Sequence, residues 1–209
     1  MVKQKIKFYF LWLSLICIVV FILQNVISGF SEFFVLNQNV FEGEIWRYLS
    51  SIFLHGSLVH LLYNLFALLF FGLVLEKTIG SRKFLIVFFA SGIIANVISV
   101  NYYPSSLGAS GAIYGVLGCL MVLRPFMMVW AFGLIMPMFL AVSLWVIGDV
   151  LRVMGLFDPG NVGSIAHLSG IGVGILLGFW FREFGSWSRI KKIEIPDNYA
   201  KIWEDRFMR

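Results

Sequence analysis

The stretch GASGAIYG, Gly108 to Gly115, places one serine among small residues at the start of an apolar segment. Two interpretations of Ser110 are open. Small residues let the backbones of two membrane helices approach closely, so the serine can be a packing residue. A serine can also be a nucleophile, provided that the chain brings it a base and hydrogen-bond donors for an oxyanion. The segments around this octet decide between the two.

The composition indicates an all-α, polytopic membrane protein. Of the 209 residues, 60% are hydrophobic and only 13% are charged, with a mean hydropathy of +0.90, whereas soluble domains are about one quarter charged. The isolated cysteines Cys17 and Cys119 lie in apolar runs without a CxxC spacing, which predicts neither a disulfide framework nor a zinc site. No basic stretch is interleaved with aromatic residues outside the apolar runs, which argues against a nucleic-acid partner.

Apolar runs of a length that crosses a bilayer predict a six-helix bundle. We expect these spans at about 8–29, 58–75, 84–101, 107–123, 126–147 and 163–181. The first run is too long for the apolar region of a signal peptide and lacks a clear cleavage site, which favours an uncleaved anchor. We expect a membrane catalytic domain over 1–184 and a short cytoplasmic tail over 185–209, with a helix-compatible end at 198–209.

The distribution of basic residues predicts the orientation. With the N-terminus inside, all of the 16 lysines and arginines except Arg47 and Arg152 fall in inner segments. Positive charge is retained on the cytoplasmic side, so both termini are expected in the cytoplasm of a multi-pass cell-membrane protein. The long first loop, about 30–57, then lies outside, and its aromatic residues suit the membrane interface.

Four polar residues share one depth in this arrangement. The second, fourth and sixth spans all run from outside to inside, and His60, Asn64, Ser110 and His167 fall within the first one or two turns of these spans. At 1.5 Å per residue they lie roughly 5–10 Å below the outer boundary. Polar side chains in a span are costly, which makes each of them a functional candidate.

These side chains suit acyl transfer. His167 is the available base for the Ser110 hydroxyl. The Ser110 backbone N–H, the Asn64 amide and a ring nitrogen of His60 can donate to an oxyanion. Hydrolysis also needs water, which requires a wet cavity open to the outer side.

Glycines on two spans support this arrangement. Small residues recur every three or four positions on the sixth span (Gly170, Gly174, Gly178) and on the fourth (Gly111, Gly115, Gly118). If the two ridges meet, the backbones approach closely and bring Ser110 within hydrogen-bonding reach of His167.

The combination resembles the rhomboid family of intramembrane serine proteases. The resemblance covers about 46–181 and rests on motifs in this order: Trp46-Arg47, His60-x-x-x-Asn64, Gly108-x-Ser110-Gly and Ala166-His167-x-x-Gly170. It implies that Ser110 is the nucleophile and His167 the base of a dyad without an acidic third member. By the same resemblance His60 and Asn64 are the oxyanion residues, and Tyr114 packs against the catalytic histidine.

The resemblance also implies substrates and moving parts. Rhomboids cleave single-span membrane proteins in or near the span. The fifth span, with Pro137, would be the family's mobile lateral gate, and the first loop would lie sideways in the outer leaflet. Glu76 matches a carboxylate that ties the inner helix ends together, although a solvated helix-end charge explains it equally well.

Several other residues have a plain structural interpretation. His55 is expected to make structural hydrogen bonds, and Trp46 and Arg47 are either interface anchors or braces of the first loop. Asp149 is expected to be a solvated charge at a helix end, the alternative being that it orients His167. No HExxH motif occurs and no acid sits among the histidines, so neither a metal nor another cofactor is expected.

Two other functions fit parts of this pattern. A catalytically silent relative that binds membrane clients would share the architecture, but such relatives usually lack the serine or the histidine. A small transporter would show internal symmetry with broken helices near the midplane, and no convincing symmetry is visible. The oligomeric state is not predicted.

Overall fold

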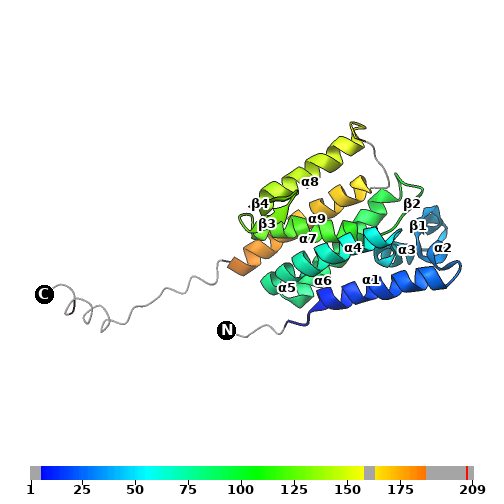
Figure 1. Cartoon of the computed structure of the whole chain (residues 1–209), viewed down its shortest axis with the longest axis horizontal. Helices are drawn as coiled ribbons and strands as arrows, with labels where there is room; N and C mark the ends of the chain where they lie inside the picture. The colour runs from blue at the N-terminus through cyan, green and yellow to red at the C-terminus, as the bar shows by residue number, and fades with distance from the viewer. Residues whose placement is uncertain (1–5, 158–162, 187–205, 207–209) are drawn as a thin grey trace.

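The computed structural model describes residues 6–157, 163–186 and 206. Apart from Arg206, the predicted tail helix over 198–209 lies outside the described residues. The described part is mainly a bundle of helices (Figure 1). The longer helices are α1 (Tyr9–Val26), α4 (Leu58–Ala67), α5 (Leu73–Ile79), α6 (Ser81–Ser99), α7 (Ser110–Leu123), α8 (Met138–Val153) and α9 (Ser164–Ser186).

Short elements complete the described fold. A π-helical turn, η3 (Leu68–Gly72), joins α4 to α5 into one continuous helical segment. The first loop contains α2 (Phe30–Phe34), η1 (Gln38–Glu42), α3 (Arg47–Ser50) and η2 (Ser51–Phe53). Its strand β1 (Leu36–Asn37) pairs antiparallel with β2 (Ser105–Ser106), which ties the first loop to the connection between α6 and α7.

Four helical segments are long and apolar enough to cross a membrane. They span Tyr9–Val26, Leu58–Ile79, Ser81–Ser99 and Ser164–Arg182. Helix α7, with 14 residues, is about 21 Å long, shorter than a hydrocarbon core of about 30 Å. Most of α7 is buried among the other helices, so its length is not set by lipid. The chain is therefore a mainly helical integral membrane protein.

The predicted fifth span, 126–147, is wrong in its first half. Residues of this segment form a hairpin of β3 (Met128–Ala131) and β4 (Leu134–Pro137), and α8 starts only at Met138. The turn residues Phe132 and Gly133 both have positive φ, 55° and 79°, as the tight turns of two-residue hairpins require. Pro137 precedes α8 because a proline inside a helix removes a backbone hydrogen bond.

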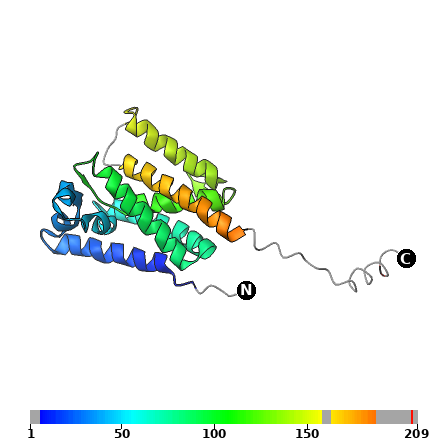
Figure 2. The same cartoon turned by 180° about the vertical axis from the view of Figure 1, so that it is seen from behind.

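The glycine ridges of α7 and α9 meet as predicted, and the two helices lie side by side in both views (Figures 1 and 2). A Cβ atom added at Gly170 would overlap the carbonyl of Gly111, and one at Gly174 would overlap the carbonyl of Gly115. The backbones of the two helices are therefore in direct contact. In both views α8 lies at one edge of the bundle and α1 at the opposite edge (Figures 1 and 2).

Arg47 braces the first loop from inside. The side chain is 4% exposed, pairs with the carboxylate of Glu44 and donates to the carbonyls of Glu32 and Val35, each at 2.7 Å. Trp46 is 40% exposed and stacks on Phe33. Of the two interpretations of this pair, the brace therefore describes Arg47, whereas Trp46 is at the surface.

Glu76 ties helix ends together rather than facing solvent. Its buried carboxylate accepts the backbone N–H groups of Tyr9 and Phe10, both at 3.1 Å, and the hydroxyl of Ser81 at 2.6 Å. The N–H groups of a first helical turn have no partner within their own helix. A carboxylate at this positive end of α1 therefore satisfies them and is itself stabilised.

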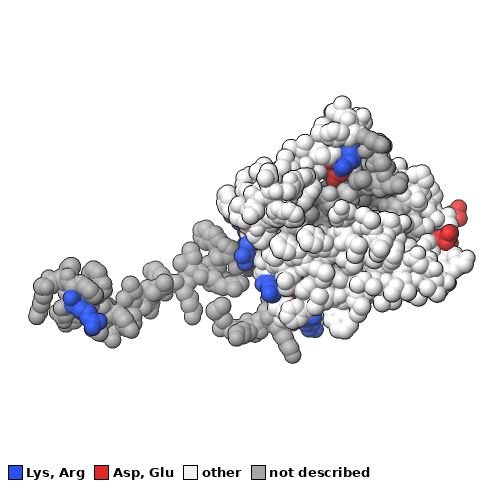
Figure 3. Space-filling view, in the orientation of Figure 1, with Lys and Arg blue, Asp and Glu red and all other residues white. Residues whose placement is uncertain are grey.

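Most charged side chains on the visible surface of the bundle lie toward the two ends of the long axis, apart from one acidic and one basic side chain near the end of α8 (Figure 3). Lysine and arginine occupy the end at which α1 begins and α9 ends, and acidic residues lie at the opposite end (Figures 1 and 3). That pair aside, the described residues visible between the two ends carry no charged side chains. A largely uncharged surface of this kind suits a bilayer, because charged side chains are costly there.

Candidate active site

Ser110 is the first residue of α7 and lies beside the start of α4. The turn that presents it requires glycine at position 108, where φ is +122°. A Cβ atom there would also lie 2.7 Å from Cε1 of the His60 ring. The N–H of Gly108 donates to the carbonyl of Ser51 at 2.9 Å, which fixes the turn to the first loop.

His167 faces Ser110 from the first turn of α9. Its Nε2 lies 3.0 Å from the Ser110 Oγ, within hydrogen-bonding distance. The ring of Tyr114 stacks on the imidazole, with centroids 4.0 Å apart and an interplanar angle of 11°. His167 is only 8% exposed. The close contact of α7 and α9 thus brings a hydroxyl and a shielded base together, as their positions in the sequence predicted.

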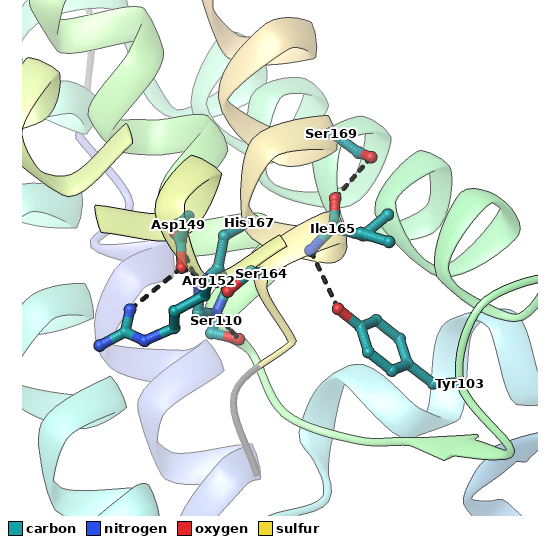
Figure 4. A network of polar contacts seen from close by, with 8 residues as sticks. All are labelled: Tyr103, Ser110, Asp149, Arg152, Ser164, Ile165, His167 and Ser169. Carbon is teal, nitrogen blue, oxygen red and sulfur yellow. Dashed lines mark hydrogen bonds and ion pairs between the residues drawn. The ribbon is translucent and has the colours of Figure 1, made fainter. Parts of the chain in front are cut away.

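Asp149 is not the solvated helix-end charge that was predicted. It is 1% exposed, and its Oδ2 lies 3.1 Å from Nδ1 of His167 (Figure 4). Its Oδ1 accepts the Ser164 hydroxyl at 2.7 Å and lies 3.4 Å from Arg152 Nη1. The resemblance implied a dyad without an acidic third member, and the structure places an acidic side chain in contact with His167. The prediction failed because the exposure of a residue near a helix end depends on which helix packs against it.

His60 and Asn64 line the same cavity as Ser110 and His167. This cavity has a volume of about 940 Å³ and reaches from the start of α4 to the hairpin of β3 and β4. Asn64 is buried, and its amide donates one hydrogen bond to the carbonyl of His60 at 2.9 Å. An amide nitrogen carries two hydrogens, so the second one is free to donate into the cavity.

His55 has the structural contacts that were predicted for it. Its backbone N–H donates to the side-chain oxygen of Gln24 at 2.9 Å, and its Nδ1 lies 3.2 Å from the carbonyl of Phe53. The ring meets that of His60 edge to face, 5.2 Å between centroids. Burial in the first loop lowers the pKa of His55 to about 4, and the neighbouring charge of His60 acts in the same direction.

Two further residues near the site did not stand out in the sequence. Ser164 reaches the carboxylate of Asp149, and the hydroxyl of Tyr103 accepts the backbone N–H of Ile165 at 3.1 Å (Figure 4). Ser164 stands three residues before His167 and so shares its helix face, a spacing that could have identified it. Tyr103 lies in a loop, where no periodicity identifies a partner.

Metal-binding side chains are not grouped in the part of the chain that the structure describes. There, no three or more His, Cys, Asp or Glu residues lie close enough together to hold one ion.

Known proteins similar to this chain belong to one family. The sequence model of the rhomboid domain matches residues 42–184. The chain is 29% identical to the rhomboid protease GlpG of Haemophilus influenzae over 80% of this chain and 87% of that protein. It is 31% identical to GlpG of Klebsiella pneumoniae over 81% of this chain and 62% of that protein. With the rhomboid protease GluP of Bacillus subtilis, identity is 42% over 41% of this chain and 17% of GluP.

Proposed function

This chain belongs to the rhomboid family and is an intramembrane serine protease, and from that premise we propose that Ser110 is its nucleophile and His167 its general base. The observation that carries this assignment is the distance of 3.0 Å between Ser110 Oγ and His167 Nε2 at the wall of the cavity. A serine hydroxyl is a weak nucleophile until an adjacent base accepts its proton.

In the first step, Nε2 of His167 takes the hydroxyl proton while Ser110 Oγ attacks the carbonyl carbon of the scissile peptide bond. The tetrahedral intermediate collapses when the protonated Nε2 gives its proton to the leaving amine. An acyl group then remains on Ser110 Oγ. Water, deprotonated by the same nitrogen, attacks this ester; the Ser110 oxygen leaves with the proton returned by Nε2, and the carboxylic acid product is released.

The oxyanion is stabilised by donors that converge on the cavity. Ser110 begins α7, so its backbone N–H has no partner within that helix. The second amide hydrogen of Asn64 and a ring N–H of His60 complete the proposed donor set. Donors in a site of low dielectric that are already oriented contribute typically two to three orders of magnitude each to the rate.

The proposed substrates are single-span membrane proteins cleaved in or near their transmembrane segment. Rhomboid proteases act on membrane proteins within the bilayer, and the cavity here is bordered by exposed apolar side chains on α4 and on the hairpin, among them Phe66 and Trp130. The transmembrane helix of such a substrate could pack against these apolar side chains, while an extended segment at its end enters the polar cavity.

We further propose six crossings with both termini in the cytoplasm of a cell-membrane protein. The common end of α1 and α9, with its basic residues, supports this orientation (Figures 1 and 3). Ser110 then lies near the extracytoplasmic side, at the end occupied by the first loop. Residues 1–184 form the proposed catalytic domain, and 185–209 a cytoplasmic tail.

The test is cleavage of a model single-span substrate by the reconstituted protein and by Ser110→Ala. We expect cleavage by the natural chain and none detectable above background with the variant, since the attacking oxygen is removed. Equal cleavage by both would exclude Ser110 as the nucleophile.

A fluorophosphonate probe provides a test that needs no substrate. It should label Ser110 in the natural chain and fail with Ser110→Ala, and labelling should fall steeply with His167→Ala because the base is lost. Cleavage and labelling absent from the natural, folded chain would favour a client-binding role.

A further inference from the structure

We propose that Asp149 is a positioning residue that fixes the tautomer and orientation of His167 and so makes α8 part of the catalytic apparatus. This inference rests on the proposed roles of Ser110 and His167. It adds a third member, from a different helix, to the pair that faces the cavity.

The tautomer follows from the contacts of the two ring nitrogens. An ionised carboxylate can only accept hydrogen bonds, so Nδ1 of His167 must carry the proton that it donates to Asp149 Oδ2 at 3.1 Å. In the neutral ring, Nε2 is then the acceptor, and this is the nitrogen that lies 3.0 Å from Ser110 Oγ. The opposite tautomer would present an N–H to the hydroxyl and could not take its proton.

The carboxylate is itself held in place. Its other oxygen, Oδ1, accepts from Ser164 at 2.7 Å and lies near the Arg152 guanidinium, so Oδ2 is left for the histidine (Figure 4). Ser164 and His167 are one turn apart on α9, which means that Asp149 binds the first turn of that helix at two points. The positive N-terminal end of α9 further favours a negative charge there.

Charge on the imidazole gives Asp149 a second effect. When Nε2 takes the serine proton, the ring becomes an imidazolium, and a carboxylate 3.1 Å away stabilises that charge. Among the residues that the structure describes, the other groups near the ring carry no compensating negative charge: Tyr114 stacks on it, and His60 lines the same cavity from α4. Arg152, 37% exposed, lies on the far side of the carboxylate.

The way α8 packs links its position to the contact between Asp149 and His167. Its other buried residues, Met138, Ala141 and Val142, all lie in its first turns, and Asp149 is the single buried residue of its second half. The attachment of the outer half of α8 to the bundle and the orientation of the base thus depend on the same carboxylate. A displacement of that half of α8 would release Nδ1.

The experiment compares Asp149→Asn, Asp149→Glu and Glu76→Gln with the natural chain and with Ser110→Ala. Cleavage of a model single-span substrate in vesicles gives kcat and KM against pH, fluorophosphonate labelling gives the reactivity of the serine, and thermal melting in detergent gives stability. Glu76→Gln is the matched control, because it neutralises another buried carboxylate that does not line the cavity.

We expect Asp149→Asn to lower kcat by about 100-fold or more, the scale of general-base catalysis, with KM little changed. The acidic limb of the pH profile should move to lower pH, since a negative charge beside the imidazolium is lost. Asp149→Glu should recover about tenfold of the lost rate by restoring the charge. Glu76→Gln should lower the melting temperature without moving the pH profile.

Natural kcat and pH profile in Asp149→Asn, with Ser110→Ala inactive, would overturn the positioning role and leave the nucleophile intact. Cleavage by Ser110→Ala would instead refute the proposed function itself. If Asp149→Asn is inactive and also no longer shows a thermal unfolding transition, the variant is not folded. Asp149 would then be a structural residue, which also overturns the inference. Inactivity and loss of labelling with the transition retained would support it.

Discussion

Asp149 and Glu76 show how a carboxylate is tolerated inside an apolar bundle. Each is buried and each has its oxygens occupied, Glu76 by two backbone N–H groups and the hydroxyl of Ser81, Asp149 by Ser164 and His167. An unpaired charge in such a place would cost several kcal/mol. The difference lies in the partners: those of Glu76 are fixed parts of the fold, whereas His167 changes its charge during the proposed reaction.

At the same scale, His55 predicts a pH dependence of stability. Its pKa in the folded chain is about 4, below the ordinary value of 6.5. Between these values the unfolded chain binds more protons than the folded one, so stability falls as the pH is lowered through this window and His55 contributes no change above it. The melting temperature in detergent should therefore decline from about pH 6.5 to about pH 4.

The variant His55→Gln supplies the comparison, because glutamine does not titrate. Its melting temperature should be lower at neutral pH, where the buried ring and its contacts are lost, but should decline less steeply on acidification. Equal slopes for both chains would show that His55 does not titrate in this range.

At the scale of elements, the contact between α7 and α9 sets the geometry of the site. Gly174→Ala would place a methyl group onto the backbone of Gly115, and overpacking of this kind costs about 1–3 kcal/mol. We expect a lower melting temperature and reduced cleavage, since separation of the helices lengthens the distance between Ser110 and His167. Thermal melting and substrate cleavage measure the two effects.

Gly172→Ala is the matched control on the same helix. Gly172 is exposed, and a Cβ atom there meets nothing within 4 Å. At an exposed position inside a helix, alanine stabilises the fold relative to glycine by roughly 0.5–1 kcal/mol. This variant should therefore melt at the same temperature or higher and should cleave the substrate normally. A loss as large as that of Gly174→Ala would contradict the packing explanation.

The hairpin of β3 and β4 shows the limit of sequence patterns at this scale. The run from 126 to 147 contains no charged residue, as is typical of a transmembrane helix. The signals against a helix were Pro137 and the pair Phe132-Gly133, which forms the turn. In a chain this apolar, hydropathy does not distinguish a strand pair from a helix. Turn-forming and helix-breaking residues do, together with the elements that pack against the segment.

At the scale of the whole molecule, the charge distribution predicts how labelling reagents reach the chain. The native cysteines, Cys17 and Cys119, are 1% and 0% exposed. A thiol reagent should therefore label mainly the cysteines that are added. Ser105→Cys and Lys77→Cys place thiols at exposed positions near opposite ends of the bundle. An impermeant maleimide should label Ser105→Cys in intact cells and Lys77→Cys only after the membrane is opened.

A reporter that is active only in the cytoplasm, fused after Arg209, checks the same orientation independently. We expect this fusion to be active. Labelling of Lys77→Cys from outside, or an external reporter, would reverse the proposed side of the active site.

The sequence by itself determined the class of fold, the helical segments apart from the hairpin, the pairing of Ser110 with His167 and the contact of the glycine ridges. These properties follow from hydropathy, helical periodicity and backbone approach, which are local or repeat at fixed spacing. The packing of the hairpin and the environment of Asp149 were decided by tertiary structure. A charged residue near a helix end is solvated or buried according to the helix that packs against it, and Asp149 meets its partner 18 residues away on α9, at a distance that no local pattern encodes.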